Sequence, residues 1–120
     1  MAGLKLAELK TFPRTIPVDF PHPTKAGKEL KVQIRTRYNH LESEEYKSLM
    51  GLDPKTLKPN HTQEEIFNVI VDWVNPEDID GVETGEEAKE ACSTFIAIQN
   101  AFINDYAECI SGFTRKNLKK

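Results

Sequence analysis

The chain has 120 residues, of which 38% are hydrophobic and 29% are charged, and its formal net charge at pH 7 is −3. This length suits a single domain with a hydrophobic core of its own. No apolar run reaches the roughly 18 to 20 residues that cross a bilayer, and residues 1–5 do not open a long apolar signal segment. These features exclude membrane-spanning, collagen-like and disulfide-stapled classes, so we expect a small soluble protein.

Charge is divided unevenly along the chain. Residues 1–37 carry eight positive and three negative side chains, whereas residues 38–110 carry four positive and sixteen negative ones. Such asymmetry is typical of an interaction surface or a nucleic-acid arm, although solvated faces that keep a protein soluble give the same pattern. A nucleic-acid adaptor would use basic side chains of the first segment, namely Lys28, Lys31, Arg35 and Arg37. That segment lacks the interleaved aromatic residues of a single-strand binder, which argues against nucleic acid as a partner.

The first third of the chain predicts a β-hairpin. We expect residues 1–13 to form a flexible arm. Apolar and polar residues then alternate over residues 14–20 and again over residues 30–38, with turn-forming Pro and Gly residues between the two runs. Strict alternation is typical of strands that have one face on a core and the other in water. Pro17 lacks a backbone N–H, which places the first strand at a sheet edge.

Helical segments are expected after the hairpin. The first covers residues 41–50. The second covers residues 62–74, where apolar residues recur at helical spacing; Thr62 and Glu65 fit a capping box at its start, and Pro76 follows its end.

The last helical stretch is the longest. Thr84 and Glu87 fit a second capping box, and the apolar stripe continues to about Ser111, with Gly112 as the terminator. Ser93 and its neighbour Thr94 could divide this stretch into two helices.

Together these segments predict an α+β fold that is mainly helical, with an N-terminal β-hairpin followed by three to four α-helices. We expect a single domain over residues 14–113 and a basic tail over residues 114–120. The hairpin's apolar face and the helical stripes need each other for burial, because two strands alone are marginal in water.

An acidic segment raises the question of calcium binding. When Gly81 is the sixth position of an EF-hand loop, Asp78, Asp80 and Glu87 take the third, fifth and twelfth positions, which supply ligands. The first position is then Pro76, which has no side-chain oxygen. The simpler interpretation is an acidic turn with Gly81 at a positive φ. A small metal-binding or adaptor domain that uses this loop remains the alternative function.

Residues suited to catalysis or zinc binding are scattered. Cys92 and Cys109 lie on the apolar stripe of the last helical stretch, which is typical of reduced core thiols in a cytosolic protein. His22, His40 and His61 have none of the short spacings of a metal site. No Gly-rich phosphate loop is present. We therefore expect a non-enzymatic protein with no metal, cofactor or catalytic residues.

Apolar helix stripes are the candidates for a partner-binding surface. Part of this surface is expected to bind another protein or subunit, although all of it could instead close the domain's own core; Trp73 has the same two interpretations. The candidate residues are Ile66, Ile70, Trp73, Phe95, Phe102 and Tyr106.

Several features in their order along the chain resemble one protein family. They are Ile16-Pro17-Val18-Asp19-Phe20 and Leu30-Lys31-Val32-Gln33-Ile34-Arg35 in the hairpin, the acidic helix Glu44-Glu45-Tyr46-Lys47-Ser48-Leu49, Val71-Asp72-Trp73 followed by Asp78-Ile79-Asp80-Gly81, and the C-terminal Phe102-Ile103-Asn104-Asp105-Tyr106 with Arg115-Lys116-Asn117-Leu118. This combination, spread over residues 12–120, is similar to the tail assembly chaperones of long-tailed bacteriophages and prophages.

The resemblance implies a function in virion morphogenesis. Such chaperones bind the tape measure protein, and often the tail tube subunit, before tail assembly in the host cytoplasm, and they are absent from the mature virion. They often self-associate, and many have a longer form made by a ribosomal frameshift. The family has no catalytic residues to carry over. The chain departs from the family pattern because residues 86–111 lack a proline between the last two helices.

Overall fold

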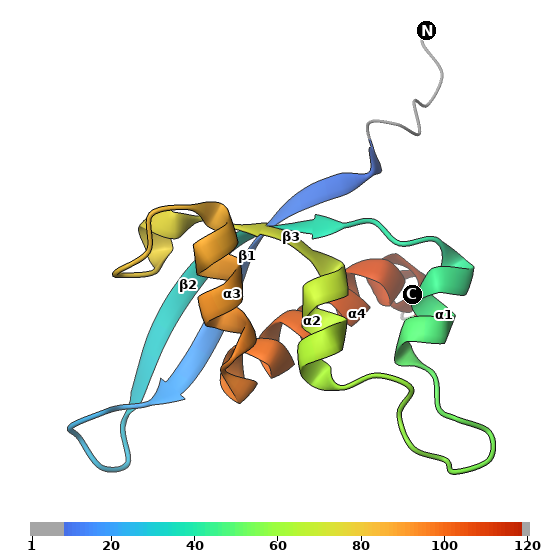
Figure 1. The fold of residues 1–120 in the computed structure, drawn as a ribbon, viewed down its shortest axis with the longest axis horizontal. Helices are drawn as coiled ribbons and strands as arrows, with labels where there is room; N and C mark the ends of the chain where they lie inside the picture. Colours follow the sequence, from blue (N-terminus) through green and yellow to red (C-terminus); the bar gives the residue numbers. More distant parts are fainter. Residues whose placement is uncertain (1–8, 119–120) are drawn as a thin grey trace, which may run out of the picture.

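The computed structural model describes the backbone of residues 9–118 and the side chains of residues 9–110. The chain forms one sheet and a set of helices (Figure 1), with the bounds β1 Thr11–Pro21, β2 Glu29–Asn39, α1 Ser43–Met50, α2 Gln63–Ile70, β3 Val71–Val74, the 3₁₀ turn η2 Pro76–Asp78, α3 Gly85–Ser93 and α4 Ile96–Leu118. The sheet is antiparallel, with the strand order β1-β2-β3. The predicted α+β class, with an N-terminal hairpin followed by helices, is confirmed.

The hairpin keeps one unbroken register along its whole length, from Thr11 opposite Asn39 to Pro21 opposite Glu29. Even-numbered residues in its middle are buried and odd-numbered ones are exposed, as the alternation predicts. The position of β1 at the edge of the sheet confirms the inference from Pro17.

Strand β1 starts earlier than the sequence indicated. Residues 11–13, which we assigned to the flexible arm, belong to the sheet. Phe12 explains the difference, because its ring packs edge-on against that of Tyr38 with the centroids 5.5 Å apart. The predicted arm over residues 1–8 lies outside the described residues.

The prediction of a single helix over residues 62–74 is wrong at its C-terminal end. The capping box is present, with Thr62 N–H donating to Glu65 and Glu65 N–H donating to Thr62 Oγ1. After Ile70, however, the chain becomes strand β3, which pairs with β2 and buries Val71 and Val74 completely. Buried residues three apart fit a helix as well as this short strand, so the apolar spacing misled the prediction.

The long C-terminal stretch is divided where Ser93 and Thr94 suggested. Helix α3 ends at Ser93 and α4 begins at Ile96, and the side-chain amide of Gln99 donates to the Ser93 carbonyl across the break. The predicted stop at Gly112 is wrong, because the helical backbone continues through it to Leu118. Residues 114–118 of the expected basic tail therefore extend α4.

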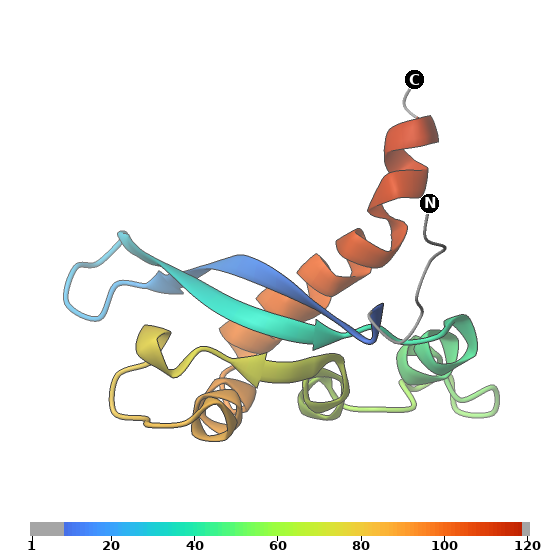
Figure 2. The same ribbon diagram turned by 90° about the horizontal axis from the view of Figure 1, so that it is seen from above.

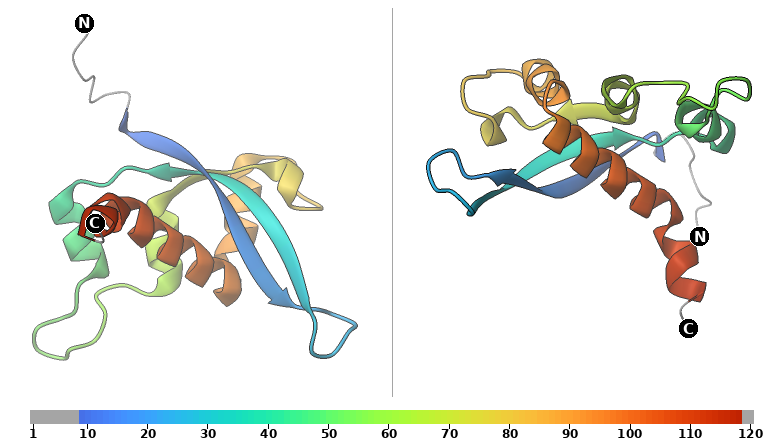
Figure 3. Two further views of the ribbon diagram at one scale, coloured as in Figure 1. Left: turned by 180° about the vertical axis from the view of Figure 1, so that it is seen from behind. Right: turned by 90° about the horizontal axis from the view of Figure 1, so that it is seen from below.

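Helices α2, α3 and α4 pack against the inner side of the sheet, and α4 crosses beneath the hairpin (Figures 2 and 3). The core lies between these layers, and its centre is a group of aromatic rings in mutual contact. Those rings are Tyr38, Phe67, Phe102 and Tyr106. The turn of the hairpin and helix α1 lie at opposite ends of the molecule (Figure 1).

A polar contact ties α4 to the sheet inside this core. The hydroxyl of Tyr38, which has no exposed surface, lies 3.0 Å from the Phe102 carbonyl and 3.1 Å from the Asp105 carboxylate. Arg14 on β1 donates to both oxygens of the same carboxylate. Burial and the nearby Asp105 raise the pKa of Tyr38 well above its ordinary value, which keeps the hydroxyl protonated as a donor.

We expect Tyr38→Phe to lower the free energy of unfolding by about 1 to 2 kcal/mol, because it deletes a buried hydrogen-bond donor and keeps the ring. Urea denaturation followed by circular dichroism measures the change. Tyr46→Phe is the matched control, since no described residue hydrogen-bonds to the Tyr46 hydroxyl. Equal midpoints for the two variants would contradict the role given to Tyr38.

Candidate functional site

The six residues proposed from the sequence as a partner surface do not form one surface. Ile66, Ile70, Phe102 and Tyr106 are buried in the domain's own core, so this fold does not present them to a partner. Phe95 is different, because 56% of it is exposed at the junction of α3 and α4.

Trp73 is half-buried and is held from two sides. The guanidinium of Arg37 lies over its ring, 5.5 Å from the ring centroid. On the other side the indole lies against Gly85, the first residue of α3, where a Cβ atom would overlap the Trp73 ring. Only glycine fits this position without displacing the ring. The indole therefore fixes the start of α3 against β3 and is a structural residue here.

A largely apolar groove with a volume of about 720 Å³ lies between α1 and α4. The apolar side chains on its wall include exposed Leu9 and Ile110 together with half-buried Phe12 and Tyr46. We call it the α1–α4 groove. Among the described residues, its lining consists of Leu9, Thr11, Phe12, His40, Leu41, Ser43, Tyr46, Lys47, Cys109 and Ile110.

A second apolar surface lies at the N-terminal end of α4. Phe95 and Ile96 are 56% and 68% exposed, respectively, at the turn between α3 and α4, which we call the α3–α4 corner. Beside them is a hollow of about 170 Å³ with an entirely apolar lining. That lining is Phe20, Ile79, Ala91, Cys92, Phe95 and Ile98.

Of these two surfaces, sequence reasoning identified Phe95 alone. Ile96 was missed although it follows Phe95 directly at the break between the helices, where two adjacent apolar residues cannot both point into the core. Leu9 and Ile110 were missed because the groove joins the start of β1 to the second half of α4, and no local pattern signals that contact.

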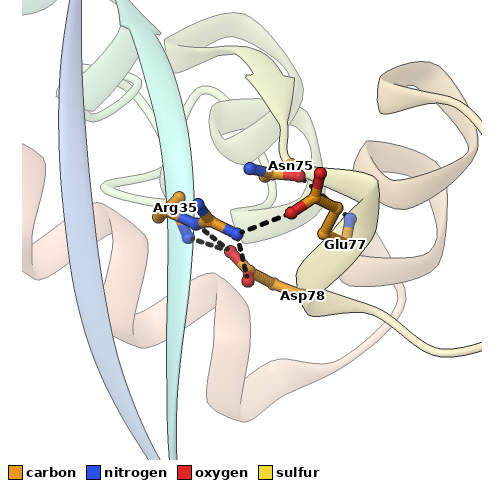
Figure 4. A network of polar contacts seen from close by, with 4 residues as sticks. All are labelled: Arg35, Asn75, Glu77 and Asp78. Carbon is orange, nitrogen blue, oxygen red and sulfur yellow. Dashed lines mark hydrogen bonds and ion pairs between the residues drawn. The ribbon is translucent and has the colours of Figure 1, made fainter.

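The acidic segment after β3 is an anchor for the sheet (Figure 4). The carboxylate of Asp78 accepts the backbone N–H of Arg35 at 2.8 Å and the Arg35 guanidinium at 3.0 and 3.1 Å. Glu77 adds a longer contact of 3.4 Å to the same guanidinium, and Asn75 caps η2 by accepting the Glu77 N–H. The hydrogen bonds from Arg35 lower the pKa of Asp78 below its usual 3.8.

In this structure, two carboxylates that the calcium-loop alternative would need have other partners. Asp78 is engaged by Arg35, and the carboxylate of Glu87 accepts the N–H of Glu83. Across residues 9–110, no three His, Cys, Asp or Glu side chains converge as a metal site would require. Gly81 has a φ of +87°, which confirms the positive φ predicted for it.

Half of the basic set considered for nucleic acid is already neutralised. Arg35 pairs with Asp78, and Arg37 Nε donates to Asp72 at 2.6 Å. Lys28 and Lys31 form no ion pair with any other described residue. The four side chains therefore do not act as one positive patch.

The two cysteines remain free thiols, and neither shows the features of a nucleophile. Burial raises the pKa of Cys92 to about 11, and burial with the nearby Asp105 raises that of Cys109. A raised pKa keeps a thiol protonated and unreactive near neutral pH.

In the described part of the chain, none of the helices is both long enough and apolar enough to cross a membrane. Comparisons of the chain with protein-family models, with curated proteins and with solved structures gave no match. The functional assignment therefore depends on the two apolar surfaces and on the ordered features of the sequence.

We expect the contact between Asp78 and Arg35 to make stability depend on acid pH. The folded state lowers the pKa of Asp78, so its contribution to stability is complete above its usual pKa of 3.8 and is lost as the pH falls through the lower folded value. Asp78→Asn should therefore destabilise the protein at pH 7 and lose less further stability between pH 5 and pH 2.5 than the parent chain. Thermal melts across this range measure how the stability of each protein changes with pH. Parallel pH profiles for the variant and the parent chain would contradict the contribution assigned to Asp78.

Proposed function

We propose that this protein is a non-enzymatic tail assembly chaperone of a long-tailed bacteriophage or prophage. In this role it binds the tape measure protein, the tail tube subunit or both in the host cytoplasm before assembly, and it leaves no copy in the mature virion. The proposal is supported by the ordered sequence features and, in the structure, by one observation above all: an open apolar groove that the domain does not fill with its own described side chains.

The apolar lining of the α1–α4 groove suits an amphipathic helix. Helix-in-groove recognition places a few apolar side chains of one helix face into a hydrophobic recess. Leu9 and Ile110 expose 39% and 37% of their surface on the groove wall, and the rings of Phe12 and Tyr46 contribute to its lining. Tape measure proteins are long and helical, so they offer many such faces.

The charge next to the groove suits a protein that keeps a client soluble. The start of α1 carries the exposed carboxylates of Glu42, Glu44 and Glu45, and Glu108 is exposed on α4 next to the groove residue Cys109. Like charges around an apolar contact repel other complexes of the same kind. Binding and mutual repulsion are the two properties that a holding chaperone needs.

The test is co-expression with the long helical protein encoded downstream of this chain's gene. We expect the two proteins to elute together in size-exclusion chromatography. The double substitution Leu9→Glu with Ile110→Glu should weaken this binding by about tenfold or more, because it places two charges in an apolar contact. Isothermal titration with the purified partner measures the change.

Leu57→Glu is the matched control, since Leu57 is 72% exposed and lies outside the groove. It should bind the partner like the parent chain, and all variants should keep the parent's circular dichroism spectrum. The proposal fails if the downstream DNA encodes no long helical or tail tube protein, or if the folded groove variant binds its partner as tightly as the control.

A further inference from the structure

The outer half of β2 has an open hydrogen-bonding edge. Within the hairpin, the backbone groups of even-numbered residues bond to the opposite strand. The hydrogen bonds at the two ends of the hairpin show this, because His22 N–H donates to the Lys28 carbonyl and His40 N–H donates to the Lys10 carbonyl. The N–H and C=O of odd-numbered residues therefore point away from the partner strand. At Arg35 these groups bond to Asp78 and to Asn75.

Further along β2, the same groups have no partner. Strand β3 pairs only with residues 36–38 of β2, so the hairpin continues past it toward its turn (Figure 2). No described residue hydrogen-bonds to the outward backbone groups of Glu29, Lys31 or Gln33. A strand edge of this kind is a template for another strand.

The opposite edge of the hairpin is closed to strand addition. Pro13, Pro17 and Pro21 occupy odd positions of β1, where an N–H would point outward from the sheet. Each proline removes one outward donor and leaves the ladder with β2 intact. The hairpin is thus protected on one edge and open on the other.

We propose that the open edge of β2 pairs with the same edge of a second copy of this chain, in antiparallel orientation about a two-fold axis at Leu30. This inference does not depend on the proposed role in tail assembly. In this register Glu29 of each copy lies opposite Lys31 of the other, so two pairs of opposite charges form across the dyad. Charge pairs directly opposite in antiparallel strands stabilise the pairing. A register centred on Lys31 would instead oppose two lysines.

Exposed apolar side chains lie near this two-fold axis, on the core side of the sheet. Leu30 is 42% exposed and, like its register partner Phe20, lies on the core side of the hairpin. Phe20 and Phe95 line the same hollow, and Ile96 is exposed next to it. A two-fold axis perpendicular to the sheet keeps the core sides of both copies on one side. Pairing therefore brings Leu30 against Leu30 and turns the two α3–α4 corners toward each other.

Charges next to the edge also match. The antiparallel register carries the hairpin turn of one copy, with Lys25 and Lys28, along the strand toward η2 of the other. There the side chain of Glu77 is 78% exposed, and its contact with the Arg35 guanidinium is long, at 3.4 Å. Neither lysine forms an ion pair with any described residue of its own copy.

Substitution by proline tests the edge directly. Sedimentation velocity over a concentration series at low salt should show a dimer of the parent chain. Lys31→Pro removes an outward donor from β2 and should raise the dissociation constant at least about tenfold, because each copy loses an intermolecular hydrogen bond. Asp19→Pro is the matched control, since Asp19 is the register partner of Lys31 and points its N–H from the closed edge. It should dimerise like the parent chain.

Charge exchange tests the register and holds even if a proline variant fails to fold. Glu29→Lys and Lys31→Glu should each weaken the dimer, whereas an equimolar mixture of the two should associate as well as the parent chain. The double variant should also regain association. The proposal is overturned if the parent chain stays monomeric at about 1 mM, if Lys31→Pro and Asp19→Pro behave alike, or if the mixture does not associate.

Discussion

The fold depends on the contact between the Tyr38 hydroxyl, the Asp105 carboxylate and the Arg14 guanidinium, which joins strands β1 and β2 to α4. An isolated hairpin buries one apolar face at most, and it needs a partner layer to be stable in water. Helix α4 supplies that layer for β1, and the buried hydroxyl fixes its position along the hairpin. Because a buried donor without a partner is costly, a shift of α4 along the sheet would be penalised twice, in packing and in hydrogen bonding.

This constraint determines where surfaces can remain open. With α4 held under the sheet at Phe102 and Asp105, Cys109 and Ile110 further along the helix line the α1–α4 groove, and its N-terminal end forms the α3–α4 corner. The hairpin turn and α1 lie at opposite ends of the molecule (Figure 1). A helix bound in the groove and a second copy paired along β2 would therefore occupy separate regions, so both can be bound at once.

The sequence was a good guide where a pattern had one interpretation. Alternation over the hairpin predicted both strands, and Pro17 predicted the edge, because a period of two cannot be confused with a helix. Val71 and Val74 were assigned to a helix, because buried positions three apart fit a helix as well as a short strand. In the fold, Val71 pairs with Tyr38 on β2, so the segment is a strand. Gly112 was taken as a stop, yet glycine is tolerated within a helix at a modest cost.

The candidate surface was harder to predict for a physical reason. A helical apolar stripe shows which residues leave water, but it does not show whether they pack on their own domain or on another protein. Ile70 and Phe102 therefore looked like partner residues and are core residues, while the groove joins Leu9 to Ile110 across the whole chain. The unpaired edge of β2 is equally invisible, because it arises from the shortness of β3.

The position of Trp73 gives the protein a built-in optical probe. It is the single tryptophan of the chain, and it lies between the Arg37 guanidinium and the backbone of Gly85. Its emission wavelength and its quenching therefore report on the junction between the sheet and α3. Because Trp73 lines neither the α1–α4 groove nor the hollow at the corner, a ligand in either place can leave that emission unchanged while the fold stays intact. Intrinsic fluorescence can thus separate loss of structure from loss of a partner without any label.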